Sequence, residues 1–184
     1  MDTSYLPSVI KQFEYNKSLG DKTFKQLSKN ELFWKYNEES NSVATIVKHI
    51  SGNMLSRWTN FLTEDGEKPW RNRDDEFINT YTSKEEMVAD WNKGWQCLFE
   101  NLLKINAENS DTIVYIRNEG HTIAEAINRQ LCHYSYHIGQ MVVLGKMAKN
   151  TDWQTLSIAK NASKSYNEEK FAHNKERKHF IDGL

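Results

Sequence analysis

The sequence is poor in residues that break helices or cross-link them. Of its 184 residues only 8 are glycine and 2 are proline, about half of the usual combined share of roughly 12%. Many short strands would need turns rich in these residues, so the scarcity favours long helices. The two cysteines, Cys97 and Cys132, have no CxxC or CxxxC partner. We therefore expect neither a disulfide framework nor a cysteine-based zinc motif.

The sequence also lacks an excess of one charge and a long apolar run. It has 24 Lys and Arg against 25 Asp and Glu, and its pI is near 6.6. A nucleic-acid-binding scaffold would carry a basic excess. No apolar run approaches the roughly 18 residues of a membrane span, and the first residues do not resemble a signal peptide. We expect no nucleic-acid partner, no membrane association and a cytoplasmic location.

Enough apolar side chains are present to form a core. Hydrophobic residues make up 38% of the chain and aromatic residues 12%, which is too rich for a disordered chain, although the mean hydropathy is −0.78. The length matches about one domain. We therefore expect a single folded domain over residues 1–184.

Apolar residues recur at steps of three and four in four segments, which predicts four amphipathic helices. The first is expected over residues 5–28, and the second starts after the N-cap Ser42. The third and fourth start at capping-box patterns, S-x-x-E from Ser83 and T-x-x-E from Thr122, in which two side chains satisfy free backbone N–H groups. Three tryptophans of these segments are expected to fill the core: Trp58, Trp91 and Trp95.

These elements predict an all-α fold, a four-helix bundle over about residues 5–150 with a C-terminal extension over about 151–184. Residues 63–82 have many charges and no sustained period, so we expect a loop with at most a short helical turn. This connection exceeds the two to eight residues that are usual in bundles, which indicates a crossover or a functional loop. Within the extension, residues 163–180 are expected to form a polar helix or to be frayed.

Histidine is the residue type that indicates chemistry. His133 and His137 lie four residues apart in the last predicted helix, so one face presents both imidazoles. Two nitrogens at that spacing can bind one metal ion at about 2.0–2.1 Å, and His49 in the second helix is the best candidate for a third ligand. Such a site would leave one coordination position for water or substrate. The alternative is that these are surface or hydrogen-bonded core histidines, and spacing alone does not decide.

Other polar residues near these histidines have two interpretations each. Asn53 and Gln130 could contact a ligand, but a solvent-facing asparagine is the simpler interpretation of Asn53. Tyr134 fits either a cavity wall or the core. Cys132 points about 100° away from its neighbour His133 around the helix, so we expect a small buried side chain and no fourth ligand.

Several other kinds of site lack support. No acidic residue stands out as a general base, and the phosphate-binding loop, dinucleotide fingerprint, H-E-x-x-H and G-x-S-x-G motifs do not occur. The remaining histidines are expected to be solvated: His121, His173 and His179.

Two long segments resemble the DUF1572 group of the DinB-like superfamily. They are HISGNMLSRWTNFLTEDGEKPWRNRDDEF, residues 49–77, and HYSYHIGQMVVLGKMAKNTDWQTLSI, residues 133–158, and the likeness covers residues 5–168. The resemblance implies a DinB-type four-helix bundle. It also implies a divalent metal, zinc or nickel, held by a histidine of the second helix and an H-x-x-x-H of the last bundle helix. The matching positions are His49, His133 and His137.

The resemblance further implies a chemistry. Relatives in the superfamily include thiol-dependent transferases and YfiT-like proteins classed as metal hydrolases, and many form dimers. For this chain it implies a metal-dependent thiol S-transferase or hydrolase that acts on a small-molecule thiol or electrophile, and a homodimer. The alternative is a non-catalytic bundle stabilised by metal, or a stress-related interaction module. A closed four-ligand shell would favour that alternative, whereas a cavity lined by Asn53, Arg57 or Gln130 would favour catalysis.

Overall fold

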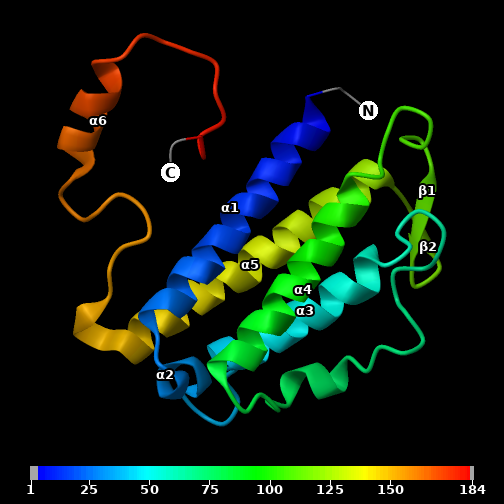
Figure 1. Cartoon of the computed structure of the whole chain (residues 1–184), viewed down its shortest axis with the longest axis horizontal. Helices are drawn as coiled ribbons and strands as arrows, with labels where there is room; N and C mark the ends of the chain where they lie inside the picture. Colours follow the sequence, from blue (N-terminus) through cyan, green and yellow to red (C-terminus); the bar gives the residue numbers. More distant parts are fainter. Residues whose placement is uncertain (1–3, 183–184) are drawn as a thin grey trace.

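The computed structural model describes residues 4–182 and is mostly helical (Figure 1). A short helix α2 (Lys29–Phe33) follows the first long helix, and α6 (Ser163–Phe171) lies in the C-terminal extension. The prediction of an all-α helical bundle is confirmed. Among the described residues, no helix combines the length and apolar character needed to cross a bilayer. The four long helices are α1 (Tyr5–Gln26), α3 (Val43–Trp58), α4 (Lys84–Leu102) and α5 (Ile123–Lys149).

Helices α3, α4 and α5 begin directly after the residues that their capping patterns predict. Ser42 caps α3 through its side chain, and the capping box at Thr122 is complete. At the start of α4, Ser83 Oγ accepts the backbone N–H of Glu86, as expected. The Glu86 carboxylate, however, accepts the backbone N–H of Thr82 at 2.8 Å. The predicted box at Ser83 is therefore only half correct, because its second hydrogen bond is moved back by one residue.

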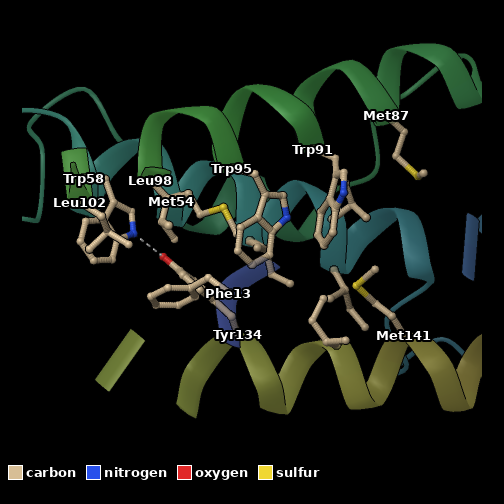
Figure 2. Packing of buried hydrophobic residues seen from close by; sticks show 14 of the residues in the cluster. Phe13, Met54, Trp58, Met87, Trp91, Trp95, Leu98, Leu102, Tyr134 and Met141 are labelled. Atoms are coloured by element: carbon tan, nitrogen blue, oxygen red, sulfur yellow. Dashed lines mark hydrogen bonds between the residues drawn. The ribbon is translucent and has the colours of Figure 1, made fainter. Parts of the chain in front are cut away.

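One aromatic side chain from each long helix meets in the centre of the bundle (Figure 2). The ring of Phe13 on α1 has its centroid 6.2 Å from Trp58 on α3 and 6.2 Å from Trp95 on α4. It lies 6.0 Å from Tyr134 on α5. All four side chains are fully buried, and the two edge-to-face contacts of Phe13 with the tryptophans add to the free energy gained by burial alone. With Trp91, which is also fully buried, they confirm the predicted aromatic core.

A β-hairpin between α4 and α5 was not predicted from the sequence. Strand β1 (Ile113–Ile116) pairs antiparallel with β2 (Glu119–Thr122) at one end of the bundle (Figure 1). The two turn residues, Arg117 and Asn118, have φ of 57° and 61°, a left-handed backbone that such turns usually give to Asn-Gly. Asp65 accepts both backbone N–H groups, at 2.9 and 2.8 Å. The turn thus depends on a carboxylate from a distant loop.

The long connection and the C-terminal extension agree with expectation. Within residues 63–82, the only helical turn is the 3-10 helix η1 (Asp74–Phe77), which packs on α3. After α5 come η2 (Asn150–Asp152) and then α6, which covers about half of the predicted segment 163–180. Beyond α6 the chain returns to α1, where the ring of Phe180 packs on Tyr15 at 5.0 Å.

Two helix glycines provide a matched test of core packing. A Cβ at Gly20 would lie 2.4 Å from Cζ2 of Trp91, whose indole N–H is bonded to Asp21. A Cβ at Gly139 would meet nothing within 4 Å. Gly20→Ala should lower the free energy of unfolding by about 1–3 kcal/mol through overpacking, whereas Gly139→Ala should raise it by about 0.5–1 kcal/mol. Urea titration measures both, and equal effects would contradict the packing described.

Candidate metal centre

Three imidazoles from two helices converge on one point. Nε2 of His133 lies 3.3 Å from Nε2 of His49 and 3.1 Å from Nε2 of His137. In a tetrahedral site with bonds of about 2.05 Å, ligand atoms are about 3.3 Å apart. His49 is buried, and the other two are partly buried. The fold thus brings all three predicted residues together in a cluster that could hold a metal ion.

The other ring nitrogens determine where the protons lie. Nδ1 of His49 is 2.9 Å from Glu76 Oε2, and Nδ1 of His137 is 2.9 Å from Gln140 Oε1. Glu76 Oε2 and Gln140 Oε1 are acceptors, so Nδ1 of His49 and Nδ1 of His137 each carry a proton. In a neutral imidazole, Nε2 of each of these two histidines then has a free lone pair. One N–H on His133 Nε2 could satisfy only one of these lone pairs, whereas a cation would satisfy all three nitrogens. The donor set therefore fits a divalent metal.

The long connection supplies the support for His49. Arg71 donates to both carboxylate oxygens of Glu76, from Nε at 2.7 Å and from Nη2 at 2.9 Å. Burial by itself would raise the pKa of Glu76, but hydrogen bonds from His49 and Arg71 outweigh it and lower that pKa. The ring of Phe77 stacks on His49 at 4.8 Å. The long connection 63–82 therefore holds His49 in place through Glu76 and Phe77.

Glu76 is a partner of the site that no signal in the sequence indicated. It stands 27 residues from His49 in the chain, in a charged stretch with no helical period. No acidic residue stood out in the sequence, and the fold places this carboxylate against Nδ1 of His49. A carboxylate on a loop leaves no periodic signal, so only the fold could reveal it.

A cavity of about 500 Å³ adjoins the three imidazoles. Asn53, Arg57 and Gln130 line it, and the interpretation of Asn53 as solvent-facing is wrong, since only 5% of it is exposed. Its Oδ1 accepts the hydroxyl of Tyr134 at 3.0 Å. Gln130 is buried as well, and its Oε1 has no hydrogen-bond partner among the described residues. The cavity therefore presents polar groups beside the histidine cluster.

The remaining candidates lie outside the cluster. Cys132 is exposed, which corrects the expectation of a buried side chain, and it is not part of the cluster. His121 lies on β2, with Nε2 3.1 Å from Arg129 Nη1. His173 is exposed, whereas His121 and His179 are partly buried. The prediction that they are solvated thus holds fully only for His173.

The histidine cluster makes the stability of the metal-free protein depend on pH. Burial, followed by the neighbouring His137 and His49, lowers the pKa of His133 to about 3, against an ordinary value of about 6.5. The folded chain therefore binds a proton less readily than the unfolded chain. The free energy of unfolding should fall as the pH decreases from about 6.5 towards about 3.

Urea unfolding of metal-free protein at about pH 7 and about pH 5 measures this loss. In His133→Gln, which cannot take up the proton, the loss between the two pH values should be smaller than in the wild type. An equal loss in both proteins would show that His133 does not contribute.

Comparison with known proteins agrees with the resemblance to DUF1572 noted in the sequence. The family model of DUF1572, described as a protein of unknown function, matches residues 1–162. The match covers most of the chain and includes all three clustered histidines. A search of curated proteins found no match. The chain therefore belongs to the DUF1572 family.

Proposed function

We propose that this protein is a divalent-metal-dependent enzyme of the DinB-like type, in which His49, His133 and His137 hold zinc or nickel. Its reaction is thiol transfer or hydrolysis on a small molecule. The observation that supports this most is the convergence of three Nε2 atoms on one point beside a cavity. Among the described residues, no fourth His, Cys, Asp or Glu joins this cluster, and three protein ligands with an open position are typical of catalytic metal sites.

A bound divalent ion would lower the pKa of a coordinated water or thiol, so that hydroxide or thiolate forms near neutral pH. The residues of the chain orient and shield the site. Glu76 and Gln140 keep the Nδ1 protons of their histidines in place, which fixes both rings. Phe77 covers one face of His49 and limits access of water. Asn53 and Gln130 provide polar contacts for a substrate.

The second candidate is a metal site with a purely structural role. Such sites usually close with four protein ligands, and the cluster has three. The cavity beside it has about 500 Å³, which is within the roughly 300–1,000 Å³ of ligand pockets. These two observations favour the catalytic interpretation.

Loss of one imidazole should release the metal. Elemental analysis should find about one divalent ion per chain in the wild type and far less in His137→Ala, since two protein ligands bind weakly. His173→Ala, at an exposed histidine, is the matched control and should keep its ion. Added zinc or nickel should raise the melting temperature of the wild type and of the control only. Equal metal content in all three proteins would contradict the assignment.

Glu76 should influence the metal through His49. Glu76→Gln removes the charge that supports the imidazole, and metal affinity should fall about 10–100-fold, as for other residues behind metal ligands. Competition with a chromophoric chelator measures this affinity. Glu85→Gln, an exposed carboxylate on α4, is the control. If Glu76→Gln and the control bind the metal alike, Glu76 has no supporting role.

Activity itself needs a direct test. Metal-loaded protein should transfer small-molecule thiols to electrophiles or hydrolyse activated esters or amides, and His137→Ala should not. Absence of turnover across a broad panel with the metal bound would leave the structural role as the function.

A further inference from the structure

Arginines gather in the cavity beside the histidines to an unusual degree. Five of the six arginines of the chain line this cavity. The described residues that line it include none of the 18 lysines. The five are Arg57, Arg71, Arg73, Arg117 and Arg129. The planar guanidinium group pairs with both oxygens of a carboxylate or phosphate, which lysine cannot do. Because arginine and not lysine lines the cavity, the residues indicate an oxyanion ligand and not merely a need for positive charge.

The acidic residues in contact with these arginines are too few to balance them. Glu76 pairs with Arg71. A single oxygen of Glu67 lies 3.0 Å from Arg57, 3.3 Å from Arg71 and 3.2 Å from Arg117. Arg73 lies 3.9 Å from the exposed Asp74. Five guanidinium groups thus face three carboxylates, which leaves a surplus of two positive charges before any metal is bound. A cavity with such a surplus attracts anions.

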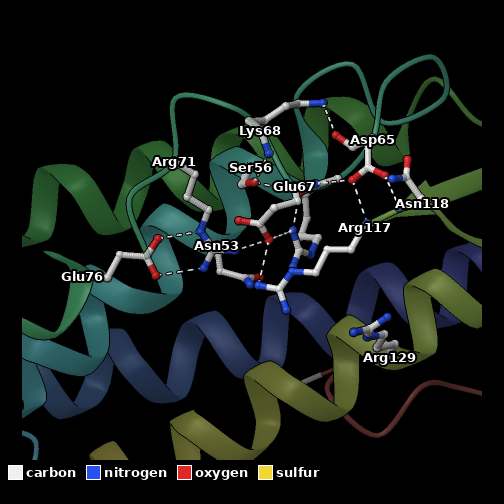
Figure 3. Close-up of polar contacts among 12 residues, drawn as sticks. Asn53, Ser56, Asp65, Glu67, Lys68, Arg71, Glu76, Arg117, Asn118 and Arg129 are labelled. Atoms are coloured by element: carbon white, nitrogen blue, oxygen red, sulfur yellow. Dashed lines mark hydrogen bonds and ion pairs between the residues drawn. The ribbon is translucent and has the colours of Figure 1, made fainter. Parts of the chain in front are cut away.

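Two of the arginines are placed to reach a ligand. Arg117 occupies the left-handed hairpin turn, where Asp65 holds its backbone N–H at 2.9 Å, and 56% of its side chain is exposed. Arg129 is also exposed and precedes His133 by four residues, so it lies on the same face of α5. Figure 3 shows both side chains, from the hairpin and from α5. Arg57 and Arg71, in contrast, are buried among their ion pairs.

The backbone at Arg117 is a further observation. A non-glycine residue with φ of 57° is strained, and such strain persists where the surrounding structure enforces it and often marks functional sites. Here the Asp65 carboxylate enforces it through two hydrogen bonds. The side chain at this position lines the cavity.

Gln130 adds a second kind of contact. Its buried Oε1 lines the cavity and has no hydrogen-bond partner among the described residues. Buried acceptors are rarely left without a donor. An N–H or O–H group of a ligand would satisfy it.

We infer that the cavity binds a small molecule with an oxyanion group, a carboxylate or a phosphate, which Arg117 and Arg129 hold while Gln130 accepts a hydrogen bond from the same ligand. This rests on the proposed function, since it names the class of substrate for that site. The anion contacts themselves come from arginines and need no metal. They can therefore be tested separately from the metal.

The test uses full-length, metal-free protein, so that a probe cannot bind to the ion. Inorganic phosphate and succinate are titrated by calorimetry at constant ionic strength maintained with chloride. At least one probe should bind saturably at one site. The double variant Arg117→Gln, Arg129→Gln should weaken this binding by about tenfold or more, whereas Arg177→Gln should leave it within about twofold. Arg177 is the sixth arginine and lies outside the cavity, so Arg177→Gln controls for the loss of one positive charge, as in Arg129→Gln alone.

Both targeted side chains are exposed, so the double variant should fold, and circular dichroism with thermal melting checks this. Arg129→Gln alone, which leaves the hairpin turn unchanged, serves if the double variant is unstable. The probe that binds more tightly identifies the oxyanion as phosphate or carboxylate.

Three results would overturn the inference: no saturable binding of either probe, unchanged binding in the variants of the cavity, or equal weakening in Arg177→Gln. The metal measurements are independent of these. Loss of binding in the double variant would support the oxyanion site even if the protein held no metal. A metal bound normally, with arginine variants that behave like the wild type, would overturn this inference alone.

Discussion

A buried hydroxyl fixes the spacing of the two helices that carry the histidines. Tyr134 accepts the indole N–H of Trp58 at 3.2 Å and donates to Asn53 at 3.0 Å. Asn53 and Trp58 lie on α3, whereas Tyr134 lies on α5 beside His133. A buried polar group left without partners costs about 1–3 kcal/mol, so α3 and α5 have one preferred alignment. In that alignment His49 meets His133, and the cluster depends on it.

The long connection organises the rest of the site around this pair of helices. It is anchored on α3 by Ser56, whose hydroxyl donates to Gly66 and accepts the backbone N–H of Lys68 (Figure 3). From that anchor, Asp65 holds the hairpin turn and Glu76 holds His49. One loop therefore positions both the hairpin turn that carries Arg117 and the imidazole of His49. Its length, unusual for a bundle, is explained by these contacts.

The two ends of the cavity are linked by charge. Burial and the neighbouring imidazoles and guanidinium groups lower the pKa of His133 to about 3, so the imidazole of His133 stays neutral near neutral pH. Burial also lowers the pKa of Arg57, with Arg71 contributing in the same direction. A cation at the histidines would add to the positive charge already present. An oxyanion in the same cavity would offset that charge, so that a metal ion at the histidines and the arginine cluster could occupy one cavity.

The sequence by itself determined the four long helices, the N-cap residues of three of them and the histidine candidates. Helical periodicity and capping residues act between neighbours three or four positions apart, and the pair His133 and His137 is of the same local kind. Only the tertiary structure decided the hairpin, the support by Glu76 and the gathering of five arginines. These contacts join a loop to distant elements, such as Asp65 to Arg117, and no periodic pattern encodes them. The exposure of Cys132 also depends on the tertiary structure, because a helix face is buried only where another element packs against it.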